Sequence, residues 1–130
     1  MANFKVEYIG NLQCKATHSD TEQTFLTDAK DDSKGISPTD LLAASLATCT
    51  ASMIAFSAQN RGISVDGLEV VATRVMDMKA YAFSSIKLVV VFKNPISEEE
   101  LKVLKAVAKA CPVKKALKED IQIDMEFINK

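Results

Sequence analysis

The first part of the chain alternates hydrophobic and polar side chains with the period of two that is typical of β-strands. The alternation runs over 4–8 and again over 12–16, and the dipeptide "GN" at 10–11 between them indicates a two-residue hairpin turn. A third short strand is expected over 23–27. The polar, acid-rich segment 28–35 is expected to be a loop.

A long uncharged segment follows and predicts one long helix. Ser37 suits the N-cap, Pro38 the first helical position, and Asp40 the positive end of the helix dipole. The helix should run to about Asn60, with Gly62 available to end it. Because it is apolar on nearly all sides, we expect burial on more than one side, and a second copy of the same helix is one candidate neighbour. One face is expected to carry Leu42, Leu46, Cys49, Met53 and Phe56.

The second half of the chain predicts two long strands, then a helix, a short helical turn and a last strand. The strands are expected over 63–77 and 81–93, and the helix, opened by a capping box, over 97–110. A kink before a proline leads into a helical turn over 113–118, and the last strand is expected over 121–128. The order βββ-α-ββ-α-β has no regular βαβ alternation and predicts an α+β fold.

Composition narrows the class of protein. The chain has 130 residues, 48% of them hydrophobic, and we expect a single domain over 1–130. The 16 basic and 17 acidic residues give a net charge of −1, which favours neither nucleic acid nor an anionic membrane as a partner. No secretory signal is recognised at the start, and the uncharged run 41–60 contains too many hydroxyl and amide side chains to prefer lipid. We therefore expect a soluble, cytoplasmic protein.

The cysteines differ in their local surroundings. Cys49 lies well beyond the first helical turn among apolar residues, so burial should raise the pKa of its thiol and favour an inert structural role. Cys111 precedes a proline-led turn that carries Lys114 and Lys115. A helix start next to two cations favours the thiolate, so Cys111 is expected to be the more acidic of the two.

The third cysteine, Cys14, is expected to be a core thiol on its strand. With His18, the only histidine, it could supply half of a metal site. Because no second pair of ligands occurs at suitable spacing, no metal site is expected.

Two motifs stand out, "SPTDLLAASLATC" (37–49) and "ACPV" (110–113), and they occur together with "YIGNLQCKATH" (8–18) and "TDA" (27–29). In this order and spacing they resemble the OsmC/Ohr family of cysteine-based hydroperoxide reductases, and most closely its small OsmC-like members. The resemblance covers nearly the whole chain. It implies an intertwined homodimer in which antiparallel sheets wrap around long central helices, with active sites at the subunit interface.

The resemblance also implies a thiol peroxidase with a two-thiol cycle. Cys49 would attack an organic hydroperoxide or hydrogen peroxide and become a sulfenic acid, and Cys111 would condense with it to a disulfide. A dithiol reductant would then restore both thiols, and no cofactor is implied.

Two positions depart from the family pattern. The arginine that stabilises the attacking thiolate in peroxidatic members is matched by Gln13, and the glutamate that holds that arginine is matched by Thr39, with Asp40 beside it. Lys15 or Lys34 could supply the cation instead. Two alternatives therefore stay open: a binding or scaffold protein that has kept the fold and lost catalysis, and a thiol or persulfide oxidoreductase that uses the same pair of cysteines.

Overall fold

The computed structural model describes residues 3–30 and 35–129, so part of the expected loop 28–35 lies outside the described residues. The chain forms two compact units, Met1–Leu42 and Ala43–Lys130, and each is described by itself. One domain over 1–130 therefore stays a prediction. Helices and strands together make an α+β fold, as predicted.

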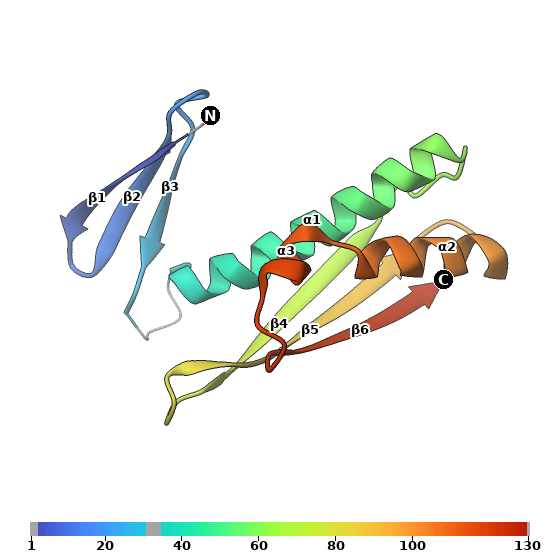
Figure 1. Ribbon diagram of the computed structural model, residues 1–130. Helices are drawn as coiled ribbons and strands as arrows, with labels where there is room; N and C mark the ends of the chain where they lie inside the picture. The colour runs from blue at the N-terminus through green and yellow to red at the C-terminus, as the bar shows by residue number, and fades with distance from the viewer. Residues whose placement is uncertain (1–2, 31–34, 130) are drawn as a thin grey trace. The chain divides into compact units, whose positions relative to one another are not determined.

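The first unit is built on a three-stranded antiparallel sheet. Its strands are β1 (Phe4–Gly10), β2 (Gln13–His18) and β3 (Thr24–Asp28), in that order across the sheet (Figure 1). All three strands were expected from the alternation. One face of the sheet is apolar, and on it the ring of Phe4 packs edge-on against those of His18 and Phe25.

The hairpin turn lies one residue later than predicted. Gly10 still belongs to β1 and pairs with Gln13, and the two turn residues are Asn11 and Leu12. Both have positive φ, 55° and 59°, which is the backbone of the turn that suits a twisted hairpin. Gly10, at φ 93°, occupies the irregular position where β1 shifts register against β2.

The long helix α1 (Pro38–Asn60) begins and ends where its sequence indicates. The backbone N–H of Asp40 donates to Ser37 Oγ at 3.1 Å, and the backbone N–H of Ser37 donates back to Asp40 Oδ2 at 3.0 Å, so the start is a capping box with aspartate as the acid. At the other end, Gly62 has φ +71° and the N–H of Ile63 donates to the carbonyl of Ala58. This is a Schellman ending, in which glycine adopts the left-handed conformation.

The described residues bury one side of α1, and burial of a second side by another copy of the helix stays a prediction. Phe56, expected on the same face as Leu46, has 67% of its surface exposed, whereas Leu46 is fully buried. An all-round apolar helix does not select a face by its own pattern, so the sheet of the second unit selects it. By length and composition alone α1 could cross a membrane, with a mean hydropathy of 1.7. Its buried residues are Ala43, Leu46, Ala47, Thr50, Ile54 and Ala58.

The second unit contains a mixed sheet of β4 (Glu69–Asp77), β5 (Ala82–Phe92) and β6 (Gln122–Asn129). β4 pairs with β5 antiparallel, but β5 pairs with β6 parallel. The expectation of antiparallel sheets is therefore wrong for this one. Two parallel strands need a crossover, and α2 (Glu98–Lys109) and α3 (Pro112–Ala116) supply it.

The strand predicted from residue 63 begins only at Glu69. The intervening segment turns at Gly67, whose φ is +79°, and the N–H of Leu68 donates to the carbonyl of Val65. The hydrophobic residues of this segment pack against the core as irregular chain. Because Gly67 has positive φ, the backbone before Glu69 is not extended, and the strand is shorter than the alternation had suggested.

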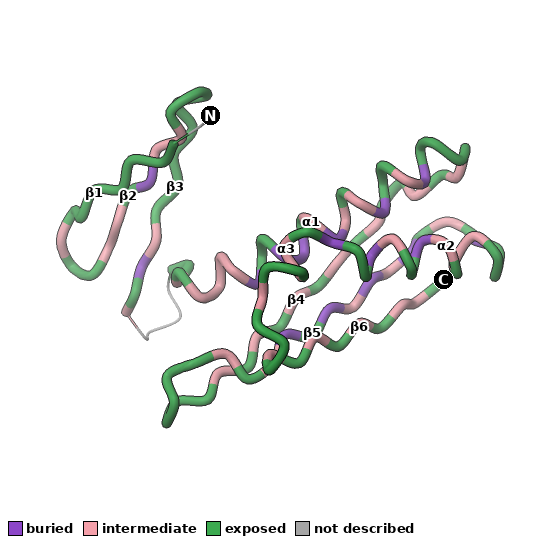
Figure 2. Tube along the Cα trace, viewed as in Figure 1, coloured by how far each residue is buried: buried purple, intermediate pink, exposed green. Residues whose placement is uncertain are grey.

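The core of the second unit lies between its sheet and its helices (Figures 1 and 2). Alternate residues of β5 are buried, as predicted, and α2 packs on them through Leu104 and Ala108. The capping box of Ser97 and Glu100 at the start of α2 is confirmed. The buried face of β5 consists of Ile86, Leu88, Val90 and Phe92.

Candidate functional site

The second unit brings two cysteines together. Cys49 lies in the middle of α1, and Cys111 lies just before α3. Both belong to the hydrophobic cluster around Leu46 and Leu88. The side chain of Cys111 is fully buried, Cys49 is partly exposed, and the two thiols interact by hydrogen bonding.

Local backbone geometry explains why amide groups reach this pair. Pro112 forces Cys111 into an extended conformation, φ −59° and ψ 127°, and starts α3 directly after it. The N–H groups of Val113 and Lys114 therefore have no partner within α3 and lie on the side of the thiols. No side chain caps the start of α3. The Val113 amide acts as an oriented dipole on both sulfurs, and the Lys114 amide acts on that of Cys111.

The two thiols are shifted in opposite directions. Burial raises the pKa of Cys49, and its interaction with Cys111 raises that pKa further, while the Val113 amide acts in the opposite direction. Burial also raises the pKa of Cys111, but the Cys49 thiol, the Lys114 and Val113 amides and the Thr50 hydroxyl outweigh it, and the net pKa of Cys111 is lowered. The pair thus shares one proton, with the thiolate favoured on Cys111.

Thr50 is the polar side chain that adjoins the pair from α1. It is fully buried, and its hydroxyl donates to the carbonyl of Leu46 at 2.8 Å. The same hydroxyl contacts Cys111. A hydroxyl has one proton, so it can accept from the Cys111 thiol while it donates to Leu46, or turn and donate to the Cys111 thiolate.

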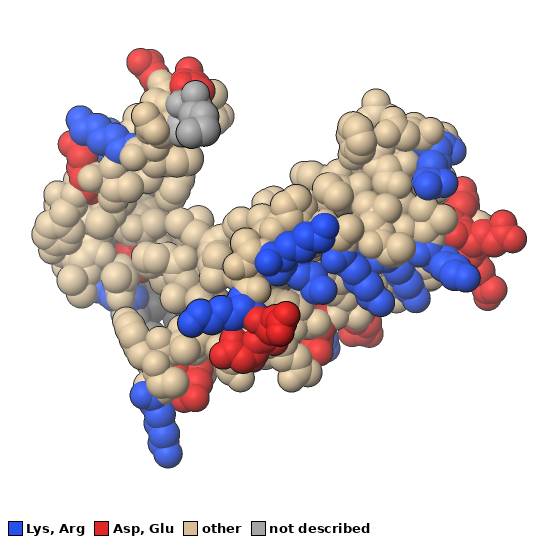
Figure 3. All heavy atoms as spheres, viewed as in Figure 1, with Lys and Arg blue, Asp and Glu red and all other residues tan. Residues whose placement is uncertain are grey.

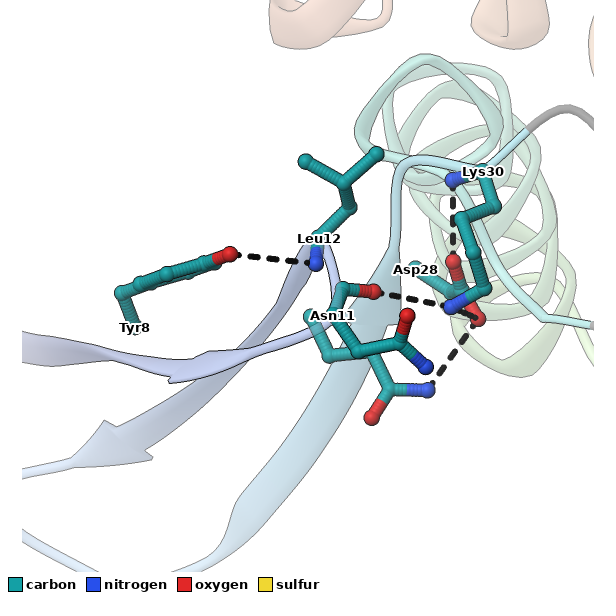
Figure 4. Close-up of polar contacts among 6 residues, drawn as sticks. Tyr8, Asn11, Leu12, Asp28 and Lys30 are labelled. Carbon is teal, nitrogen blue, oxygen red and sulfur yellow. Dashed lines mark hydrogen bonds and ion pairs between the residues drawn. The ribbon is translucent and has the colours of Figure 1, made fainter.

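Gln13, expected to support the site, is held within the first unit. Its side-chain amide donates to Asp28 Oδ2 at 3.2 Å, and the ammonium of Lys30 reaches the same oxygen at 2.9 Å (Figure 4). Lys30 also donates from its ammonium to the carbonyl of Asn11. The hydrogen bonds from Lys30 and Gln13 lower the pKa of the buried Asp28 carboxyl to about 2.

Thr39 and Asp40 are engaged at the start of α1. The hydroxyls of Thr39 and Ser37 lie 2.9 Å apart, and Asp40 forms the capping box with Ser37. Gln13, Thr39 and Asp40 belong to the first unit and the two thiols to the second, so a supporting role of these three residues stays a prediction.

The other candidate cations and ligands are also accounted for. Lys15 is exposed on β2, and Lys34 lies outside the described residues. Cys14 is half-buried, and the ring of His18 hydrogen-bonds Thr21 at 2.9 Å. Within residues 3–30 and 35–129, no three side chains of histidine, cysteine, aspartate or glutamate gather where a metal could bind.

Sequence reasoning missed three contributors to the thiol environment: the Thr50 hydroxyl and the amides of Val113 and Lys114. Thr50 follows Cys49 directly, but Ser45, Thr48 and Ser52 are hydroxyl residues of the same helix, so the sequence did not single out Thr50. The amides could be expected from a proline-led helix start, which had already indicated a more acidic Cys111. The Lys30–Asp28–Gln13 contacts carry no sequence signal, because β2 and β3 bring these residues together.

One family model and several solved structures match this chain. The family model described as OsmC, OsmC-like protein, matches residues 30–126. A protein from Psychrobacter arcticus 273-4, whose name assigns it to osmotic stress induction and the detoxification response, is 31% identical; the match covers 100% of this chain and 96% of that one, with a TM-score of 0.88.

Two more distant structures share the fold. The organic hydroperoxide resistance protein OsmC from Legionella pneumophila is 18% identical, with 98% and 96% of the two chains covered and a TM-score of 0.74. The organic hydroperoxide resistance protein OhrB of Bacillus subtilis is 23% identical, with 98% and 97% covered and a TM-score of 0.68. The search of curated proteins found no match.

Proposed function

This chain belongs to the OsmC-like protein family, and from that premise we propose that it is a thiol peroxidase that reduces organic hydroperoxides or hydrogen peroxide through Cys49 and Cys111. The interaction of the two thiols is the observation that carries the proposal. Two relatives by fold are named for organic hydroperoxide resistance, which supports the same substrate class.

Cys49 is the proposed nucleophile because it is the partly exposed member of the pair, whereas Cys111 is fully buried. Cys111 takes the proton of Cys49, and the Cys49 thiolate attacks one peroxide oxygen. The O–O bond breaks, the alcohol leaves with a proton, and Cys49 becomes a sulfenic acid. Cys111 then attacks the sulfenic sulfur, which expels water and forms the disulfide.

A dithiol reductant supplies the two electrons and two protons that restore the thiols, and the cycle uses no metal or organic cofactor. The proposed working form is a cytoplasmic homodimer. The partly exposed apolar residues of α1 support this, since a second helix would cover them; Phe56 is the largest.

The decisive experiment follows the loss of cumene hydroperoxide with dithiothreitol as the reductant. Wild type and Cys14→Ser are expected to consume the peroxide at equal rates, and Cys49→Ser to lose turnover to the level of buffer. Equal rates for wild type and Cys49→Ser would remove the proposal. Without dithiothreitol, Cys111→Ser is expected to consume one peroxide per chain and to hold a sulfenic acid that dimedone traps.

A non-catalytic binding or scaffold protein is the second candidate function. The observation that favours it is the state of Gln13 and Thr39, which hydrogen-bond Asp28 and Ser37 and supply no cation. Intact mass after peroxide treatment separates the candidates: loss of two hydrogens per chain, absent in Cys111→Ser, supports the cycle, and an unchanged mass supports the scaffold. A disulfide without peroxide turnover would instead indicate a thiol or persulfide oxidoreductase.

A further inference from the structure

A group of lysines lies on α2, on α3 and just after the end of α3. Figure 3 shows blue side chains in succession over the region that α2 and α3 occupy in Figure 1. None of these lysines forms an ion pair with a residue of the described ranges 3–30 and 35–129. We call this group the α2–α3 lysine surface; it consists of Lys102, Lys105, Lys109, Lys114, Lys115 and Lys118.

The spacing of these lysines is unfavourable for the chain on its own. Lys105 and Lys109 are four residues apart on α2, a spacing at which like charges repel one another. The acidic residues of α2 are all in its first turn, away from Lys109. The ammonium of Lys105 lies over the ring of Phe127, 5.5 Å from its centroid, but no carboxylate of the described residues forms an ion pair with either lysine. Cations that repel each other favour an anionic partner from outside the chain.

The surface includes a cleft beside the segment that holds Cys111. The cleft has a volume of about 310 Å³ and is lined by residues of α2, α3 and β6. Its two lysines come from either side of Cys111 in the chain, and its apolar residues can contact methylene groups. Two cations and one carboxylate, Asp124, line the cleft, so its side chains carry a net positive charge that favours an anionic side chain such as glutamate. The lining residues are Lys109, Lys114, Ile123, Asp124 and Met125.

We propose that the α2–α3 lysine surface docks a reductant protein with an acidic surface, which delivers a dithiol to the Cys49–Cys111 disulfide. This rests on the proposed function, because that cycle requires a dithiol. The net charge of −1 leaves the chain without an overall excess of positive charge, which disfavours a nucleic acid as the partner.

The electron flow follows from exposure and charge. A thiolate of the reductant attacks the sulfur of Cys49, the partly exposed member, and forms a mixed disulfide. The disulfide bond breaks and its electron pair leaves on Cys111, where the Lys114 and Val113 amides and the Thr50 hydroxyl favour the thiolate. The second thiol of the reductant then attacks the mixed disulfide and releases Cys49 as a thiolate.

The test does not depend on peroxide chemistry. The disulfide is prepared with diamide in Cys14→Ser, and its reduction is followed with two synthetic peptides that share one Cys-Gly-Pro-Cys dithiol. One peptide has four glutamates beside the dithiol and the other has four lysines. The glutamate peptide is expected to reduce the disulfide about tenfold faster at low ionic strength, and the difference should shrink in 1 M salt, where the Debye length is about 3 Å.

Matched variants locate the effect. Lys102→Gln/Lys105→Gln/Lys109→Gln should reduce the preference to about twofold or less, because three cations of the surface are removed. The control Lys5→Gln/Lys79→Gln/Lys87→Gln removes the same charge elsewhere and should keep it. Reduction by dithiothreitol should be the same in both variants.

Equal rates with the two peptides, or an unchanged preference in the α2–α3 variant, would overturn the proposal. If the peptide rates are equal and the surface binds a single-stranded oligonucleotide or phosphatidylserine vesicles tightly, the partner is a nucleic acid or a membrane and the proposal is overturned. If diamide forms no disulfide, the thiol cycle itself fails. Peptides with serine in place of both cysteines, measured by fluorescence anisotropy, still decide whether the surface prefers the acidic sequence.

Discussion

The thiol of Cys49 interacts with the thiol of Cys111, so the ionisation of one depends on the other. Cys49 reaches this position from the middle of α1, and Cys111 from the residue before α3. The first proton is lost more easily than from an isolated thiol because the remaining one can be shared. The second is lost with more difficulty because two negative charges would then lie side by side.

Substitution of Cys49 should reveal this dependence in Cys111. Cys49→Ser keeps a side-chain donor beside Cys111, whereas Cys49→Ala removes it. Because the hydrogen bond from Cys49 helps to lower the pKa of Cys111, that pKa should be higher in the alanine variant than in the serine variant. Titration of thiolate ultraviolet absorbance in a Cys14→Ser background measures it. The same pKa in both variants would show that the thiol contact does not control Cys111.

Thr50→Val should raise the pKa of Cys111, because the substitution replaces a hydroxyl that favours the thiolate with a methyl group of similar size. Thr50→Ser keeps the hydroxyl and should stay close to wild type. Rates of alkylation by iodoacetamide against pH report the shift. The free energy of unfolding should change by about 1 kcal/mol or less, because the carbonyl of Leu46 keeps its helical hydrogen bond. A large loss of stability would assign Thr50 to packing instead.

Asp28 should make stability depend on acid. The pKa of Asp28 in the folded chain is about 2, below its ordinary value of 3.8. The contribution of its carboxylate to the free energy of unfolding is therefore complete above pH 3.8 and is lost as the pH falls through about 2. Over this interval the wild type should lose more stability than Asp28→Asn. Urea unfolding at several pH values measures the difference, and the exposed Asp66→Asn serves as control. Parallel loss in wild type and Asp28→Asn would contradict the role of the Lys30 and Gln13 contacts.

Ser97→Ala should lower the free energy of unfolding by about 1 kcal/mol, because the hydroxyl that accepts from the N–H of Glu100 is removed. Ser97→Thr keeps that acceptor and should retain most of the stability. Thermal unfolding followed by circular dichroism compares the three proteins. An unchanged melting temperature in Ser97→Ala would show that water replaces the cap without cost.

Local features of the fold were predictable because they depend on neighbours in the sequence. The two ends of α1 follow from Ser37 and Gly62, and the start of α2 from Ser97. The buried face of β5 follows from strict alternation. The expectation of antiparallel sheets failed at β6, whose parallel direction depends on long-range pairing. The pattern of α1 selected no single side, so the sequence did not show which side the described residues bury.

The sequence by itself determined the caps, the strands and an acidic Cys111 beside a proline-led turn, because each depends on chemistry within a few residues. Only the tertiary structure decided that Cys49 meets Cys111, and that Thr50 and the Val113 amide adjoin them. It also showed that Gln13 turns to Asp28 and Lys30. The physical reason is that helix α1 is apolar on nearly every side, so its own pattern cannot choose which residue faces the core, and packing against β5 and α3 makes that choice.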